Sequence, residues 1–274
     1  MILDGKKIRN RLLEDYKRQI REENLKLTLA ILLVGDNKES MVYINNKLKY
    51  CDYVGIKTKF IKLDSNILED EVINIIEDLN NDDSITGIIL QSPVPKHINF
   101  ENCIRKIDYK KDVDGFTKDS LFSLVYNKNG LRPCTPKGII KLLEEYNISL
   151  KGKKVCIIGR GNIVGKPLIF EFLNKDATVI ILHSKSINIK EETLKADIVV
   201  ACAGVPNLVT SDMIKDNAIV IDVGITVVDD KIHGDVDFEK VKQKASYITP
   251  NPGGVGPMTI AMIIENIINA GRMK

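Results

Sequence analysis

The sequence has no long apolar run and no surplus of charge of one sign. No stretch approaches the roughly 20 uninterrupted apolar residues of a membrane span. Lysine and arginine number 40 against 37 acidic residues, a net charge of +3, which provides no broad positive field for nucleic acid. We therefore expect a cytoplasmic protein that neither spans a membrane nor binds nucleic acid.

Cysteine and histidine are few and scattered along the chain. The five cysteines contain no C-x-x-C pair, and the three histidines lie far apart in sequence. Zinc sites and disulfide frameworks both need closely patterned ligands or pairs. The sequence therefore predicts no metal site and no disulfide, and it shows no internal repeat or low-complexity tract.

Apolar runs typical of strands alternate with patterns typical of amphipathic helices over the 274 residues, 44% of which are hydrophobic. Such alternation predicts parallel sheets in an α/β protein of two domains. The predicted strands lie at 27–34, 57–63, 87–90, 154–158, 177–182, 197–201 and 218–224, and the predicted helices at 4–21, 39–54, 68–79, 137–146, 163–173 and 258–270.

The second domain is predicted to be a Rossmann-like, doubly wound parallel sheet, with the C-terminal helix returning to the first domain. Its limits are residues 120–251, and the first domain comprises residues 1–119 plus 252–274. The two are expected to be hinged near residues 119 and 252. In such sheets, ligands bind at the carboxyl ends of the strands.

A glycine turn follows the predicted strand at 154–158. Gly159, Gly161 and Gly165 lead into an apolar segment that includes Ile163. Unpaired amides at a helix N-terminus, with no Cβ in the way, approach a pyrophosphate closely. The spacing is one residue longer than the common dinucleotide fingerprint, so the turn either binds a dinucleotide or is an ordinary connection between strand and helix.

The next strand ends without the acid that an NAD-binding fold places on the ribose 2′-hydroxyl. The residues there are His183, Ser184 and Lys185, and Arg160 lies inside the glycine turn. Cations and hydroxyl donors suit a 2′-phosphate, which favours NADP over NAD. The alternative is that Arg160 and Lys185 are solvated surface charges.

Polar side chains also follow the elements of the first domain. Tyr43 and Lys47 stand at i and i+4 of one predicted helix, so they face one cavity or form a solvated edge. Gln91 follows a buried strand, and its amide both donates and accepts. Asp112 and Asp114 form either a turn or an acceptor pair for a polar heterocycle, and their spacing does not decide between these.

Seven motifs together resemble the bifunctional methylenetetrahydrofolate dehydrogenase/methenyltetrahydrofolate cyclohydrolase family, in that family's order and over nearly the whole chain. The motifs are Tyr43-Ile-Asn-Asn-Lys47, Gln91-Ser-Pro-Val-Pro-Lys-His97, Asp112-Val-Asp-Gly-Phe116, Pro133-Cys-Thr-Pro136, Gly159-Arg-Gly-Asn-Ile-Val-Gly-Lys-Pro167, His183-Ser184 and Pro252-Gly-Gly-Val-Gly-Pro-Met-Thr259.

The resemblance implies oxidation of 5,10-methylenetetrahydrofolate by NADP to the methenyl cation, then hydrolysis to 10-formyltetrahydrofolate in the same cleft. Lys47 matches the catalytic lysine, Tyr43 the aromatic that stacks on the folate, and Gln91 the amide that orients the lysine. Asp114 matches the carboxylate that binds the pterin.

The resemblance also assigns binding residues and an oligomeric state. Gly254, Val255, Gly256 and Pro257 match the folate-side loop, and the family is homodimeric. The residues implied for cofactor binding are Gly159, Arg160, Gly161, Ile163, Gly165 and Ser184, with Arg160 and Ser184 holding the 2′-phosphate.

Three positions depart from the family pattern. Gly161 stands where a serine is common, and Ser92 and Val94 replace leucines. The first removes a hydroxyl near the phosphates, and the others change the folate pocket lining. Two alternatives remain open: a dehydrogenase of this architecture that lacks the cyclohydrolase or acts on another substrate, and a non-catalytic dinucleotide-binding module.

Overall fold

The computed structural model describes residues 1–228 and 231–273. The chain folds into two compact units, each formed by two separate stretches of sequence. Unit 1 contains residues 1–10 and 135–259, and unit 2 contains residues 11–134 and 260–274. The functional domain limits given above divide the chain differently and stay a prediction.

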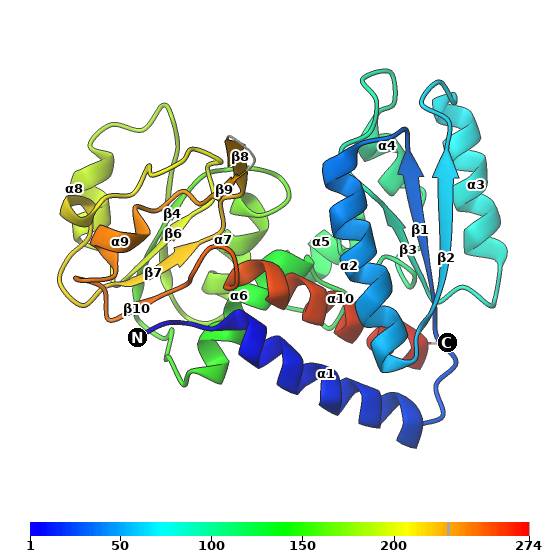
Figure 1. Cartoon of the computed structure of the whole chain (residues 1–274), viewed down its shortest axis with the longest axis horizontal. Coiled ribbons are helices and arrows are strands. Elements are labelled where there is room, and N and C mark those ends of the chain that lie inside the picture. Colours follow the sequence, from blue (N-terminus) through cyan, green and yellow to red (C-terminus); the bar gives the residue numbers. More distant parts are fainter. Residues whose placement is uncertain (229–230, 274) are drawn as a thin grey trace. The chain divides into compact units, whose positions relative to one another are not determined.

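Unit 2 contains a parallel sheet of three strands. β1 (Thr28–Val34) is central, with β2 (Lys57–Leu63) and β3 (Gly87–Leu90) beside it (Figure 1). Side chains alternate between the faces of a strand, yet β1 is buried on both faces from Leu29 to Val34. The strand therefore reads as one continuous apolar run, which is why it could be predicted.

Helices flank this sheet, and local signals set some of their ends. Asn37 accepts a hydrogen bond from the Ser40 amide at 2.8 Å and caps α2, while Gly55, at φ +90°, ends that helix in a left-handed conformation. The helices that lie wholly or mainly in unit 2 are α1 (Gly5–Glu22), α2 (Lys38–Val54), α3 (Glu69–Asn81), α4 (Phe100–Ile104), α5 (Lys118–Val125) and α10 (Val255–Arg272).

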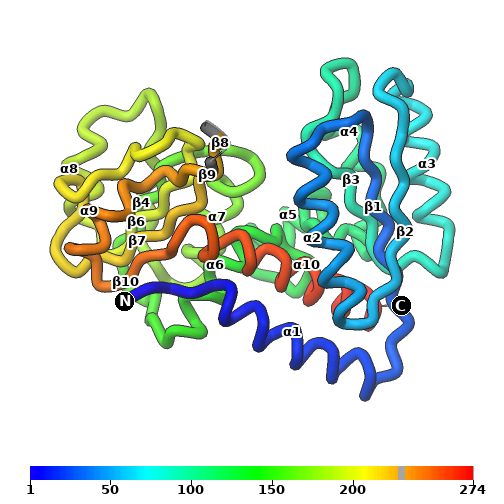
Figure 2. The backbone as a smooth tube through the Cα atoms, in the orientation of Figure 1, coloured from blue at the N-terminus to red at the C-terminus, as the bar shows by residue number. Residues whose placement is uncertain are grey.

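Unit 1 contains a parallel sheet of five strands in the order β10-β7-β6-β4-β5. The chain runs from β4 to one side and then continues on the other side, so the strand order reverses at β4. Ile2 bridges Ile248, which places the N-terminal segment beside β10 (Figure 2). The strands are β4 (Lys154–Ile158), β5 (Thr178–Leu182), β6 (Ile198–Ala201), β7 (Ile219–Asp222) and β10 (Tyr247–Ile248).

The connections of unit 1 include helices and a short antiparallel pair, β8 and β9. The remaining elements are α6 (Cys134–Glu145), α7 (Gly165–Leu173), α8 (Ile189–Leu194), η1 (Ser211–Met213), β8 (Thr226–Val228), β9 (Lys231–His233) and α9 (Phe238–Val241).

The predicted α/β class and the doubly wound parallel sheet of the second domain are confirmed. The greater part of α10, from Ile260, belongs to the same unit as β1 to β3, as predicted. Two predicted helix starts were wrong. α6 begins at Cys134, not at 137, because Pro136 fits the first turn, where an amide has no partner within the helix, and α10 begins at Val255, not at 258. Within the described ranges, every helix is too short or too polar to cross a bilayer.

Candidate active site

Lys47 and Gln91 meet inside unit 2. Lys47 lies on α2 and Gln91 directly after β3, and each side chain is only 9% exposed. The Lys47 Nζ donates a hydrogen bond to the Gln91 Oε1 at 2.9 Å, while the Gln91 Nε2 donates to the Ser92 carbonyl at 2.8 Å. The second bond holds the amide so that its oxygen faces the lysine, which leaves the amine oriented in a nearly dry site.

Asp114 is the third group of this cluster. Desolvation raises the pKa of its partly exposed carboxyl above the usual range, the nearby Lys47 ammonium opposes that rise, and Asp112 adds to it. The Asp114 carboxyl therefore interacts electrostatically with the same Lys47 amine that is hydrogen-bonded to the Gln91 amide. The structure thus brings together three of the four predicted catalytic residues.

The hydrogen bonds of Asp112 lie within the turn that carries both acids. The Asp112 Oδ1 accepts from the Gly115 amide at 2.9 Å, and its Oδ2 accepts from the Thr117 amide and the Ser120 hydroxyl, both at 2.7 Å. The side chain is 2% exposed. Asp112 therefore stabilises the turn, and ligand binding by Asp114 stays a prediction.

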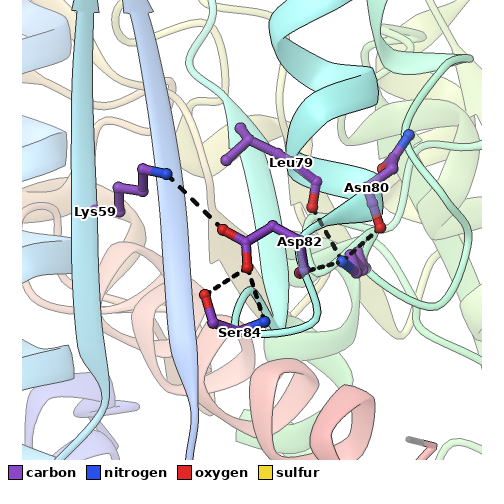
Figure 3. Close-up of polar contacts among 6 residues, drawn as sticks. Lys59, Leu79, Asn80, Asp82 and Ser84 are labelled. Atoms are coloured by element: carbon purple, nitrogen blue, oxygen red, sulfur yellow. Dashed lines mark hydrogen bonds and ion pairs between the residues drawn. The ribbon is translucent and has the colours of Figure 1, made fainter.

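The segment that carries Asp114 is anchored on its other side by Lys111, which is 8% exposed. The Lys111 Nζ donates to three carbonyl oxygens at the end of α3. They belong to Leu79, Asn80 and Asp82, at 3.0, 2.7 and 2.8 Å (Figure 3). An ammonium suits the negative end of a helix, so a buried cation and a buried anion together fix the backbone next to Asp114.

Tyr43 lies one turn before Lys47 on α2, and 42% of its surface is exposed. Desolvation, and then the charge of Glu39, raise the pKa of the Tyr43 phenol above its usual value. An exposed ring one turn from the buried amine offers a face to a flat ligand.

The predicted folate-side loop, residues 254–257, lies in unit 1 at the start of α10 rather than in a free loop. The Gly254 amide donates to the Pro250 carbonyl at 2.8 Å, which closes the turn before the helix. A Cβ at Gly256 would meet no atom within 4 Å, so the backbone there is open to a ligand.

The glycine turn follows β4 in unit 1, where the strand order reverses. Gly159 has φ +125°, and a Cβ there would lie 2.4 Å from the Cys202 carbonyl oxygen. A Cβ at Gly165 would lie 2.4 Å from the Gly159 carbonyl oxygen, whereas Gly161 has open space around it. Two glycines are therefore required for close packing, and the third leaves the turn accessible.

Arg160 and Ser184 follow neighbouring strands. Ile158 pairs with Leu182, and the Gly159 amide donates to the Leu182 carbonyl at 2.9 Å. Arg160 is two residues past Ile158, and Ser184 is two residues past Leu182. Both side chains are exposed. The structure places a guanidinium and a hydroxyl at one edge of the sheet, as a 2′-phosphate site requires. Ile163 is 47% exposed in the same turn.

Two family models match the chain. The catalytic domain of tetrahydrofolate dehydrogenase/cyclohydrolase matches residues 3–114, and the NAD(P)-binding domain of the same enzymes matches residues 133–274. The chain belongs to the tetrahydrofolate dehydrogenase/cyclohydrolase family.

Known proteins agree with this membership over the full length. The bifunctional protein FolD of Sulfurihydrogenibium sp. is 48% identical, with 100% of this chain and 98% of the relative covered. The crystal structure of FolD from Campylobacter jejuni is 43% identical, with a TM-score of 0.97 over 100% of this chain and 99% of that one. A structure of the Trypanosoma brucei methylenetetrahydrofolate dehydrogenase-cyclohydrolase (FolD), complexed with NADP cofactor and inhibitor, is 30% identical. Its TM-score is 0.95, with 100% of this chain and 97% of that chain covered.

The predicted family, enzyme class and cofactor are thus confirmed for this tetrahydrofolate dehydrogenase/cyclohydrolase. The enzyme oxidises methylenetetrahydrofolate with NADP and hydrolyses the methenyl product. Among the residues that the structure describes, no group of three or more histidine, cysteine, aspartate or glutamate side chains could hold a metal ion.

Sequence reasoning missed several buried charged residues near these sites. Lys111 was not singled out, and neither were Asp222 and Asp235 at the carboxyl edge of the unit 1 sheet. A signal was present for Asp222, because an acid near a glycine, as in Asp222-Val-Gly224, is unusual at the end of a buried strand.

Proposed function

We propose that Lys47, Gln91 and Asp114 carry both reactions of this enzyme. The single observation behind the proposal is the 2.9 Å hydrogen bond between the Lys47 amine and the Gln91 amide, beside the Asp114 carboxyl. Asp114 would bind donor groups of the pterin ring, and Tyr43 would stack on its face. In these roles the four residues hold the reacting carbon of the folate next to the amine.

The residues at the glycine turn fit NADP. Gly161 leaves the turn open, while Gly159 and Gly165 allow close backbone packing. Arg160 and Ser184 would hold the 2′-phosphate, and Ile163 would cover part of the dinucleotide. NADP supplies the hydride acceptor when bound, and the protein's part in that step is to hold the methylene carbon in position.

The hydrolysis needs a proton carrier. We assign this to the Lys47 amine, which would take a proton from water as the water oxygen bonds to the methenyl carbon. The same proton would then pass to the ring nitrogen as the bond between that nitrogen and the carbon breaks. The second proton of the water leaves to solvent as the C=O bond forms, and the formyl group remains on the other nitrogen. The open backbone of Gly254, Val255, Gly256 and Pro257 would face the folate.

We further propose that the enzyme is a cytoplasmic homodimer. The five cysteines carry free thiols, which suits a reducing compartment. Ile225, Val227 and Ile232, in and beside the β8–β9 pair, are each between 46% and 49% exposed and form an apolar surface that a second copy could cover. Light scattering at assay concentration should give twice the chain mass, and a fully active monomer would contradict the dimer.

An absorbance assay for the methenyl product tests the proposed function. Purified protein is mixed with methylenetetrahydrofolate and either NADP or NAD, and in a second reaction with methenyltetrahydrofolate alone. We expect rapid formation of the methenyl species with NADP, weaker formation with NAD, and hydrolysis without any cofactor. The absence of signal with either cofactor would contradict the dehydrogenase, and unchanged methenyltetrahydrofolate would leave only a monofunctional enzyme.

A further inference from the structure

Two buried carboxylates stand at the carboxyl edge of the unit 1 sheet and are not among the residues that the mechanism uses. Asp222 is the last residue of β7 and is 3% exposed, and Asp235 follows β9 and is 0% exposed. Buried carboxylates are costly unless hydrogen bonds hold them. Within residues 1–228 and 231–273, both carboxylates accept hydrogen bonds from backbone amides of segments at this edge.

Asp235 holds the loop that follows β6. Its Oδ2 accepts from the amides of Ala203 and Gly204, at 2.6 and 2.9 Å. The loop lies against the glycine turn, because the Cys202 carbonyl oxygen occupies the space that a Cβ of Gly159 would need, at 2.4 Å. One carboxylate oxygen thus sets the backbone orientation next to the dinucleotide turn.

Asp222 in turn holds Asp235. Its Oδ1 accepts from the amides of Asp235 and Gly224, at 2.9 and 3.1 Å. Two glycines make room for the pair: a Cβ at Gly224 would lie 2.0 Å from the Asp235 Oδ1, and a Cβ at Gly234 would lie 1.8 Å from the Asp222 Oδ2. The segment is therefore built around the two carboxylates.

We propose that Asp235, held by Asp222, is a positioning residue for NADP. In a trans peptide the N–H and the C=O point in opposite directions. With the amides of Ala203 and Gly204 turned toward Asp235, the carbonyls of Cys202 and Ala203 point away from it. The Cys202 carbonyl already lies over the glycine turn, and the Ala203 carbonyl is an acceptor for a hydroxyl or amide donor of the dinucleotide.

The test uses the fact that hydrolysis of methenyltetrahydrofolate needs no hydride acceptor. Asp235→Ala removes the acceptor of both amides, Asp235→Asn keeps an amide oxygen in its place, and Asp237→Asn is the matched control. The Asp237 carboxylate pairs with Lys240 at 2.9 Å. The bond that Asp237 makes to the Val209 carbonyl comes from its backbone amide, which the change to asparagine keeps. For each variant, the NADP dissociation constant is measured by calorimetry on the protein alone, and hydrolysis is measured without cofactor.

We expect Asp235→Ala to weaken NADP roughly tenfold or more, as for a lost hydrogen bond to a charged group, with hydrolysis changed less than about twofold. Asp235→Asn should bind NADP more tightly than Asp235→Ala, and Asp237→Asn should bind it like the wild type. Unchanged NADP binding in Asp235→Ala would overturn the proposal. Equal losses of NADP binding and of hydrolysis in Asp235→Ala would mean that Asp235 only stabilises the fold. If Asp235→Asn bound NADP no more tightly than Asp235→Ala, the acceptor role would be rejected.

Discussion

Units 1 and 2 build their binding groups in different ways. In unit 2, the groups are side chains: Lys47, Gln91 and Asp114 project from a helix and from two segments that follow strands, and they act on one another directly. In unit 1, the groups are chiefly backbone, namely the glycine turn and the loop after β6, with exposed Arg160 and Ser184 beside them.

Buried charges differ in the same way between the units. Lys111 and Asp112 in unit 2 hold the backbone next to Asp114, the proposed pterin-binding side chain, while Asp222 and Asp235 in unit 1 hold backbone segments that we propose to face NADP. A proton must move in one half, and a large dinucleotide must be held in the other. Titratable side chains suit the first task, and preorganised peptide groups suit the second.

The largest effect is expected at Lys47. Lys47→Gln is similar in length but cannot carry a proton, so cyclohydrolase activity should fall at least ~10²-fold, the usual loss for a general base, while the dehydrogenase falls much less. Both rates are measured on one preparation. Lys49→Gln, at an exposed position of the same helix, is the control and should match the wild type. Equal losses in both assays would mean that Lys47 serves binding only.

The next largest effect is expected for Lys111→Met, which should lower the stability of the fold. The change leaves several carbonyls at the end of α3 without their ammonium, so the free energy of unfolding should fall by about 2 to 4 kcal/mol. Lys59→Met is the control, since its exposed ammonium lies 4.0 Å from Asp82 (Figure 3) and should contribute less than about 0.5 kcal/mol. Similar losses from urea unfolding of the two variants would contradict the anchor role of Lys111.

A pH dependence is expected from Asp222. Desolvation raises the pKa of this carboxyl from 3.8 to about 6, against hydrogen bonds from the Asp235 and Val236 amides. A raised pKa means that the folded state binds the proton more tightly than the unfolded state, so this stabilisation is full below about pH 4 and is lost as the pH rises through 6.

Asp222→Asn removes this titration. Its stability relative to the wild type should therefore increase between about pH 4 and 7, by up to roughly 2 to 3 kcal/mol, and then level off. Thermal unfolding of both proteins at several pH values measures the difference. A difference that is flat across this range would show that the Asp222 carboxyl titrates normally.

The smallest of these effects is expected for Arg160→Ala, which should weaken the binding of NADP but not of NAD. Removing a charged hydrogen bond to phosphate weakens NADP by about one to two orders of magnitude while NAD is hardly affected. Calorimetric titration with each dinucleotide measures both values on the same protein. If both cofactors weakened equally, Arg160 would not recognise the 2′-phosphate.

Much of the fold and of the unit 2 site could be predicted from sequence. Buried parallel strands are continuous apolar runs, so β1, β4 and β6 were located to within a residue or so of their observed ends. Residue type and place drew attention to Lys47, Gln91 and Asp114, but their catalytic roles were assigned only through the resemblance to the family and stay a prediction. β10, with two residues, was too short to leave a pattern.

The carboxylates of unit 1 could not be predicted in the same way. Asp235 bonds to amides 31 and 32 residues away, and Asp222 bonds to an amide 13 residues away. Such contacts depend on tertiary structure, and the groups they bind are present in nearly every residue. Spacing alone left the roles of Asp112 and Asp114 open, because it does not show which of the two carboxylates accepts the amide hydrogen bonds of the turn.

The comparison of the two units is tested most directly by measuring the dehydrogenase and cyclohydrolase rates of Lys47→Gln and Asp235→Ala side by side, with NADP below saturation. We predict opposite changes in the ratio of the two rates: Lys47→Gln loses mainly the cyclohydrolase, and Asp235→Ala loses mainly the dehydrogenase. A shift of the ratio in the same direction in both variants, or no shift in either, would contradict the division of labour between side chains in unit 2 and backbone in unit 1.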